Sequence, residues 1–205
     1  MINVQKRRII TAKECKQDLK NHLEMIFRSV ENGINGYNEV LSLFPVTART
    51  RALEANVLNS KIIESIQNSF PEYWRFGKYG RFVLRINGYN ILFKKLNNKD
   101  LPMNVRTRNV VAIENQFQLN LFDDPAFTDT IEPIVFFGYK KDKWGEIIDL
   151  KLVYIDEGKI KWTISQSEIK IEQVPESVIT INTSIEEKPK VFIRDNKIKQ
   201  NRKVK

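Results

Sequence analysis

The sequence predicts an α+β protein, with an N-terminal helical layer packed on an antiparallel β-meander and a basic, flexible C-terminal tail. Two observations carry this prediction. Apolar residues recur every three or four positions within residues 11–70, which is the period of amphipathic helices. Runs of β-branched and aromatic residues, separated by short turns, fill residues 133–173 and are typical of consecutive strands. A chain of 205 residues is long enough to bury a sizeable core.

Three helices are expected within residues 11–70. The first begins at Thr11, where Thr-x-x-Glu forms a capping-box pattern, and is expected to end near Gly33. A short second helix is expected to stop at Pro45, because a proline ring blocks its continuation. Thr47 can cap the third helix. The pattern favours a layer packed on the sheet over a helix-turn-helix reader of DNA, because no clear recognition helix follows a tight glycine turn.

The strands begin with a hairpin over residues 81–96. Its two apolar runs flank Asn87-Gly88, a pair that favours a two-residue type I′ turn. Helical spacing returns over residues 106–117 and predicts one more helix. The meander then fills residues 133–173, with its last strand expected at residues 168–173.

One domain is expected over residues 1–182, and residues 183–205 are expected to form a charged, disordered tail. From Arg194 to Lys205 the tail holds six Lys or Arg residues against one Asp. Such a segment is suited to non-specific contact with phosphates.

The formal net charge of +9 favours polyanionic partners, with DNA or RNA first and an acidic protein second. Aromatic residues interleaved with cations can stack on bases, and paired arginines in the first turn of a helix suit a bound phosphate. The residues predicted on these grounds to contact nucleic acid are Arg49, Arg51, Trp74, Arg75, Lys78, Arg81, Arg106, Arg108, Arg202 and Lys203. The sequence does not distinguish DNA from RNA.

Cys15 is the single cysteine, so an internal disulfide is excluded and a thiolate zinc site is not expected. A reducing, cytoplasmic location fits this cysteine usage. No apolar run approaches the roughly 18 residues of a membrane span, and no signal peptide is expected.

The residues Gln118-Leu119-Asn120-Leu121-Phe122 contain a Gln followed by spaced apolar side chains. This stretch resembles the pentapeptide with which many bacterial DNA-processing proteins dock on the replication sliding clamp. The resemblance implies that Leu121 and Phe122 fill an apolar pocket and that Gln118 and Leu119 complete the contact, while Asn120 departs from the usual small or acidic residue. The alternative is that Leu121 and Phe122 belong to the core.

Asp149-Leu150-Lys151 resembles one half of the motif of restriction-type nucleases, which needs a further acid nearby to hold Mg²⁺. Strand alternation places Asp149 and Lys151 on one face and Ile148, Leu150 and Leu152 on the other. The interpretation that the pattern favours is a solvated Asp and Lys on an exposed face. No cofactor is expected, with Mg²⁺ needed only for nuclease activity.

Two classes of function follow. The first is a small nucleic-acid-associated binding protein of bacterial, phage or mobile-element type, recruited to the sliding clamp if the pentapeptide is functional. The alternative is a toxin or phage-defence effector, either a metal-dependent nuclease or an RNase, neutralised by an acidic partner. A single His and the absence of a glycine-rich phosphate loop favour a protein that is not an enzyme.

Overall fold

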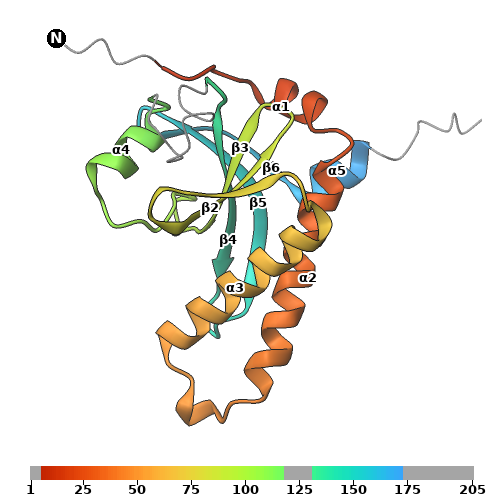
Figure 1. The fold of residues 1–205 in the computed structure, drawn as a ribbon, viewed down its shortest axis with the longest axis vertical. Helices are drawn as coiled ribbons and strands as arrows, with labels where there is room; N and C mark the ends of the chain where they lie inside the picture. The colour runs from red at the N-terminus through yellow and green to blue at the C-terminus, as the bar shows by residue number, and fades with distance from the viewer. Residues whose placement is uncertain (1–5, 118–130, 173–205) are drawn as a thin grey trace, which may run out of the picture. The chain divides into compact units, whose positions relative to one another are not determined.

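The computed structural model describes residues 6–117 and 131–172, in which α-helices lie before, within and after the strands of a single β-sheet (Figure 1). The prediction of an α+β fold is therefore confirmed. The described α-helices are α1 (Ala12–Asp18), α2 (Leu23–Ser42), α3 (Arg51–Ser69), α4 (Arg108–Glu114) and α5 (Gln166–Glu172), with short 3₁₀ turns η1 (Val46–Ala48) and η2 (Lys78–Gly80). The expected boundary at residue 182 and the tail lie outside the described residues.

Six strands form one sheet in the order of the sequence, β1 to β6. Every neighbouring pair is antiparallel except β3 and β4, which are parallel because the chain crosses back, through α4, before β4 begins. The strands are β1 (Trp74–Gly77), β2 (Arg81–Ile86), β3 (Tyr89–Lys95), β4 (Ile134–Lys141), β5 (Ile147–Asp156) and β6 (Lys159–Ser165). The expected hairpin lies at β2 and β3, with Asn87 and Gly88 both at positive φ in its turn.

The expected break between a first and a second helix is wrong, because α2 runs without interruption from Leu23 to Ser42. Gly33 lies inside α2 rather than at its end. A Cβ built on Gly33 would lie 2.8 Å from the Cα of Ile62 in α3. This glycine therefore allows two helix backbones to approach closely, a role that sequence spacing alone does not reveal.

The last strand expected in the meander is also wrong, because residues 166–172 form α5. Ser165 precedes this helix, and the Glu168 carboxylate accepts a hydrogen bond from the Ser165 backbone N–H at 3.1 Å. Ser-x-x-Glu is a capping-box pattern, and here it overrides the alternation of apolar and polar residues. The helix expected at 106–117 is shorter, because Thr107 caps α4 by accepting from the Val110 N–H at 3.2 Å.

The sheet has buried side chains on both faces. On one face α2 and α3 cover an apolar cluster in which the rings of Phe27 and Phe137 meet at 4.8 Å between centroids. On the other face Val83, Phe136 and Val153 pack with α4. Among the described helices, none is long and apolar enough to cross a membrane.

Candidate nucleic-acid interface

The residues predicted to contact nucleic acid lie in three separate places. These are the connection between α2 and α3, the segment from β1 to the start of β2, and the start of α4. Figure 1 shows the α2–α3 connection at the end of the helical hairpin remote from both α1 and α4. The three places hold, in that order, Arg49 and Arg51; Trp74, Arg75, Lys78 and Arg81; and Arg106 and Arg108. Arg202 and Lys203 lie outside the described residues.

The connection between β1 and β2 is a tight turn at η2 in which a large residue has a left-handed backbone. Tyr79 has φ 60°, and the following Gly80 has φ 65°. A bulky side chain at positive φ costs free energy, and such residues are concentrated at functional sites. The turn leaves Tyr79 84% exposed. The local backbone thus displays an aromatic side chain to solvent.

A pocket of about 280 Å³ lies beside this turn, and we call it the basic pocket. Its walls come from η2, from the first residues of β2, from the last residues of β3 and from α3. The side chains that define its chemistry are three cations, three aromatic rings and one amide: Lys78, Arg81, Lys94, Tyr79, Phe82, Phe93 and Asn59.

Arg81 and Lys94 are the central pair of cations in the basic pocket. Leu84 of β2 lies opposite Ile91 of β3, and counting outward along both strands places Arg81 opposite Lys94. Both side chains are partly buried. Like charges that face each other across antiparallel strands are destabilising, so this pair raises the free energy of the unliganded fold.

Burial acts on both cations, and repulsion by Arg81 acts on Lys94 as well. Burial lowers the pKa of Lys94, and the nearby charge of Arg81 lowers it further. Burial likewise lowers the pKa of Arg81. Neither side chain has a hydrogen bond or ion pair to any carboxylate in the part of the chain that the structure describes. A bound anion would supply the missing counter-charge.

Exposed rings lie close to the basic pocket along the chain. Phe76 of the edge strand β1 is 52% exposed, and Tyr79 is more exposed still. Exposed rings beside cations can stack on unpaired bases while the cations neutralise phosphates. Trp74 is less available, since its ring stacks on Phe82 at 6.1 Å and packs against the core.

Other predicted cations have local backbone partners. Arg75 donates to the carbonyl of Trp74 at 2.7 Å, and Arg49 donates to the carbonyl of Phe44 at 3.0 Å. Arg106 precedes α4 instead of lying in its first turn, so only Arg108 has the position expected from the sequence. These four side chains are exposed or partly exposed, and none of them lines the basic pocket.

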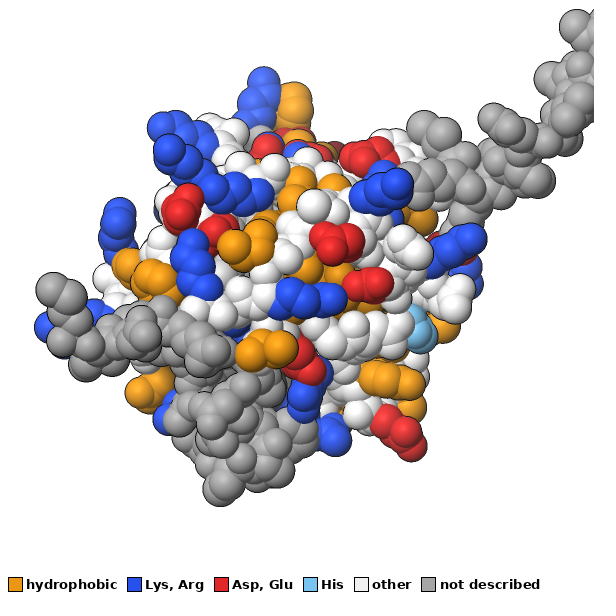
Figure 2. Space-filling view, turned by 90° about the horizontal axis from the view of Figure 1, so that it is seen from above, with side chains coloured by type: hydrophobic (Ala, Val, Ile, Leu, Met, Phe, Trp, Pro, Cys, Tyr) orange, Lys and Arg blue, Asp and Glu red, His pale blue; other side chains and the backbone are white. Residues whose placement is uncertain are grey.

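Charge is mixed rather than continuous on the described part of the face that Figure 2 presents. Figure 2 shows Lys and Arg side chains scattered among Asp and Glu side chains over the face that it presents. The cations gathered in the basic pocket are therefore better evidence for a binding site than the net charge of the chain.

Of the seven side chains that define the basic pocket, only Lys78 and Arg81 were predicted from the sequence, and the most informative of the others are Lys94 and Tyr79. Lys94 could have been predicted from the sequence. A two-residue turn at Asn87-Gly88 pairs the residues on either side of it, and counting outward from that turn places Arg81 opposite Lys94. The signal for Tyr79 was weaker, since nothing in the local pattern predicts its positive φ.

The Asp149–Lys151 pair belongs to a compact cluster of four charges. Lys140 lies 2.7 Å from Asp100 and 3.2 Å from Asp149, while Lys151 lies 2.8 Å from Asp149 and 3.2 Å from Asp100. Burial raises the pKa of Asp100, but the hydrogen bonds from the two lysines outweigh burial and hold it below its ordinary value. The two carboxylates are thus neutralised by two ammonium groups.

A β-bulge positions Asp149 in that cluster. The pairing of Gly138 with Lys151 and of Lys140 with Ile148 leaves one extra residue in β5, and Asp149 there has φ 58°. The expected alternation is therefore wrong at this point, since Ile148 is 44% exposed and Ile147 packs against the core instead. Within the described residues, no three His, Cys, Asp or Glu side chains gather as a metal site would require.

The pentapeptide of Gln118, Leu119, Leu121 and Phe122 lies outside the described residues. Comparison with protein-family models, with curated proteins and with solved structures found no match to this chain. The proposals below therefore rest on its own residues and geometry.

Proposed function

We propose that this chain is a nucleic-acid-binding protein that holds a backbone phosphate between Arg81 and Lys94. The observation that carries the proposal is a pair of partly buried cations, facing each other across two strands, without a carboxylate partner in the described residues. Desolvated cations bind phosphate more strongly than exposed ones, because the local dielectric is lower. Arg can contact two phosphate oxygens at once, and Lys adds a point charge.

Exposed rings beside the pocket favour a single strand over a duplex. Tyr79 and Phe76 can stack on bases only where those bases are unpaired, and stacking is typically worth about 1–3 kcal/mol per base. A rigid duplex would keep its bases inside and offer only phosphates to these residues. Single-stranded DNA and RNA are therefore the expected ligands.

The test compares Arg81→Ala/Lys94→Ala with the wild type, measuring binding of a fluorescent single-stranded oligonucleotide by anisotropy over a range of salt concentrations. Loss of a desolvated phosphate contact should weaken affinity at low salt by about tenfold or more. The magnitude of the salt slope should fall by about 0.7 for each phosphate contact removed. The matched control is Lys99→Ala/Lys159→Ala, which removes two exposed cations elsewhere and should change affinity little. Equal affinity of the wild type and the pocket variant would contradict the proposal.

Nuclease activity is the second candidate, and one observation favours it. Lys151 pairs with Asp149 at 2.8 Å and with Asp100 at 3.2 Å, so Asp100 is a candidate for the further acid that such a motif would need. A divalent ion would have to displace both Lys140 and Lys151, because each ammonium group pairs with both carboxylates. The expected result, if this candidate holds, is Mg²⁺- or Mn²⁺-dependent cleavage of DNA or RNA that is abolished in both Asp149→Ala and Asp100→Ala. Intact substrate after incubation with wild-type protein and either ion would remove this candidate.

A further inference from the structure

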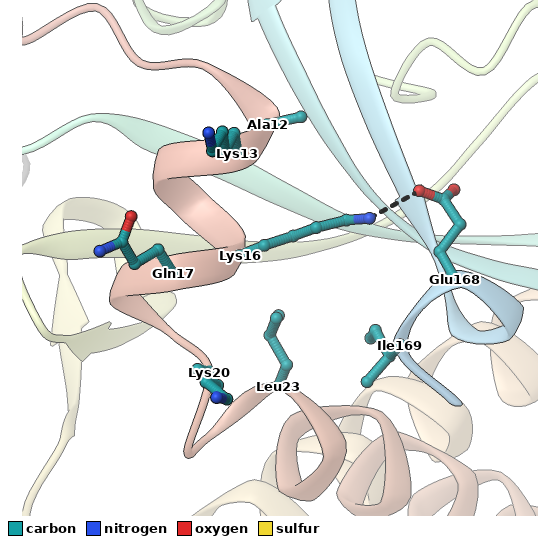
Figure 3. Close-up of a pocket in the computed structure, with 8 residues that line it drawn as sticks. All are labelled: Ala12, Lys13, Lys16, Gln17, Lys20, Leu23, Glu168 and Ile169. Carbon is teal, nitrogen blue, oxygen red and sulfur yellow. Dashed lines mark ion pairs between the residues drawn. The ribbon is translucent and has the colours of Figure 1, made fainter. Parts of the chain in front are cut away.

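A second concave surface lies between α1, the start of α2 and α5, and we call it the lysine groove (Figure 3). Its volume is about 520 Å³. Its floor is apolar and comes from Leu23 and Ile169, two core residues that are only 3% and 6% exposed. The groove lies between elements distant in sequence, and its volume is within the size range of ordinary ligand sites.

Cations line one wall of this groove. Lys13, Lys16 and Lys20 all project from the segment that contains α1, while Glu168 of α5 lies opposite (Figure 3). Lys16 and Glu168 form an ion pair at 3.1 Å that spans the groove. Lys13 and Lys20 are exposed, and their ammonium groups have no hydrogen bond or ion pair within the described residues. Three lysines against one carboxylate leave the groove with a formal charge of +2.

We propose that this groove binds an acidic, amphipathic peptide segment of a partner protein. Carboxylates of the segment would face Lys13 and Lys20, and its apolar side chains would pack on Leu23 and Ile169. The exposed charges would set orientation and encounter rate, and the apolar contribution would come from burying the segment's own side chains, because Leu23 and Ile169 are already almost fully buried.

The chemistry of the lining favours a peptide over a nucleic acid. The described residues that line the groove include no aromatic ring on which a base could stack. Glu168 is already paired with Lys16, so it does not distinguish one anion from another, and the absence of a ring among these residues is what favours a peptide. None of the groove residues also lines the basic pocket, so the two sites are chemically and spatially separate. The inference therefore stands whether or not the chain binds nucleic acid.

The test uses the full-length, ¹⁵N-labelled protein and a short synthetic peptide in which Glu-Glu and Leu-Leu pairs alternate. Chemical-shift changes are expected in α1, at the start of α2 and in α5. One matched peptide replaces every Glu with Gln, and another replaces every Leu with Ser. Both should bind more weakly, because each lacks one of the two features that the groove recognises.

Charge reversal locates the contact on the protein. Lys13→Glu/Lys20→Glu should weaken the peptide's affinity by about tenfold, which is the effect of reversing two exposed charges. Lys99→Glu/Lys159→Glu changes net charge equally at exposed positions outside the groove and should have little effect. Arg81→Ala/Lys94→Ala should leave peptide binding unchanged, which separates this test from that of nucleic-acid binding.

Several outcomes would overturn the proposal. Equal binding of the Leu-to-Ser peptide would reveal only a polyanion surface, and complete displacement of the peptide by a single-stranded oligonucleotide would assign the groove to nucleic acid. Shift changes confined to residues outside the groove would locate the peptide elsewhere. Concentration-dependent self-association that perturbs the same residues without peptide would make a second copy the occupant.

Discussion

Cys15 illustrates how burial alone changes the chemistry of a residue. Its side chain has no solvent exposure, and burial is the main cause that raises its pKa to about 12. The thiolate is the nucleophilic form of cysteine, so a buried thiol with a raised pKa is inert. The single cysteine of this chain therefore acts as a small apolar residue of the core.

Cys15 should not react with Ellman's reagent at pH 8 in the folded protein and should react fully after unfolding in urea. The sign of the pH dependence follows from the raised pKa. The unfolded thiol ionises near the ordinary value of 9.0 and the folded thiol near 12, so its contribution to stability is complete below pH 9 and is lost as pH rises toward 12. Rapid labelling of the native protein at pH 8 would contradict the buried position.

Arg81 and Lys94 differ from Cys15, because partial burial leaves their positive charges without a neighbouring carboxylate in the described residues. Burial is the first cause that lowers the pKa of each, and no carboxylate in the described structure offsets it. A mutation that removes one of these cations should therefore cost little stability while it weakens binding. Thermal unfolding of the Arg81→Ala and Lys94→Ala variants should show Tm values equal to or slightly above that of the wild type.

At the scale of elements, α2 and α3 depend on one glycine for their close approach. An Ala side chain at Gly33 would place its Cβ 2.8 Å from the Cα of Ile62, and backbone cannot move aside as a flexible side chain can. Gly36 lies one turn further along the same helix, where a Cβ would meet only the side chain of Lys61 at 3.5 Å. Alanine at these two positions therefore gives the same gain in helix propensity, but only alanine at Gly33 collides with α3.

Gly33→Ala should destabilise the protein by about 1–3 kcal/mol, because overpacking outweighs the improved helix propensity. Gly36→Ala should instead stabilise it by about 0.5–1 kcal/mol, since alanine is the better helix former and the space is open. Urea unfolding followed by circular dichroism measures both changes. Equal effects of the two substitutions would show that contact between α2 and α3 does not depend on Gly33.

At the scale of the whole molecule, the described surface carries separate candidate sites for different partners. The basic pocket lies at η2 and the ends of β2 and β3, and the lysine groove lies between α1 and α5. The proposed clamp-binding pentapeptide would add a third contact. A protein with these sites could hold nucleic acid while a partner protein is bound.

Recruitment to the sliding clamp is tested with tagged full-length protein in a nuclease-treated bacterial lysate. If the pentapeptide is functional, wild-type protein should retain the clamp and Leu121→Ala/Phe122→Ala should lose it, because both apolar anchors are removed. The variant must show the same Tm as the wild type for this interpretation. Absence of the clamp from the wild-type sample, together with a lowered Tm for the variant, would assign Leu121 and Phe122 to the core.

Local pattern alone could predict much of the fold. Amphipathic spacing, the Asn-Gly turn and the β-branched runs indicated the helical layer, the hairpin and the strands β4 to β6, because each signal lies within a few residues. The errors arose where one local signal competed with another. Gly33 allows α2 and α3 to pack closely and does not end a helix. Ser165 and Glu168 lie at the start of α5, where the alternation of apolar and polar residues predicted a strand.

The candidate sites depended more on tertiary structure. The sequence by itself determined the basic balance, the cation-rich segment that contains Arg81, and the hairpin whose register pairs it with Lys94. Only the folded chain decided that α3 closes the basic pocket, that Asp100 joins Asp149, and that α5 lies across from α1. The physical reason is that burial, charge pairing and concavity arise from contacts between segments distant in sequence, which no local pattern encodes.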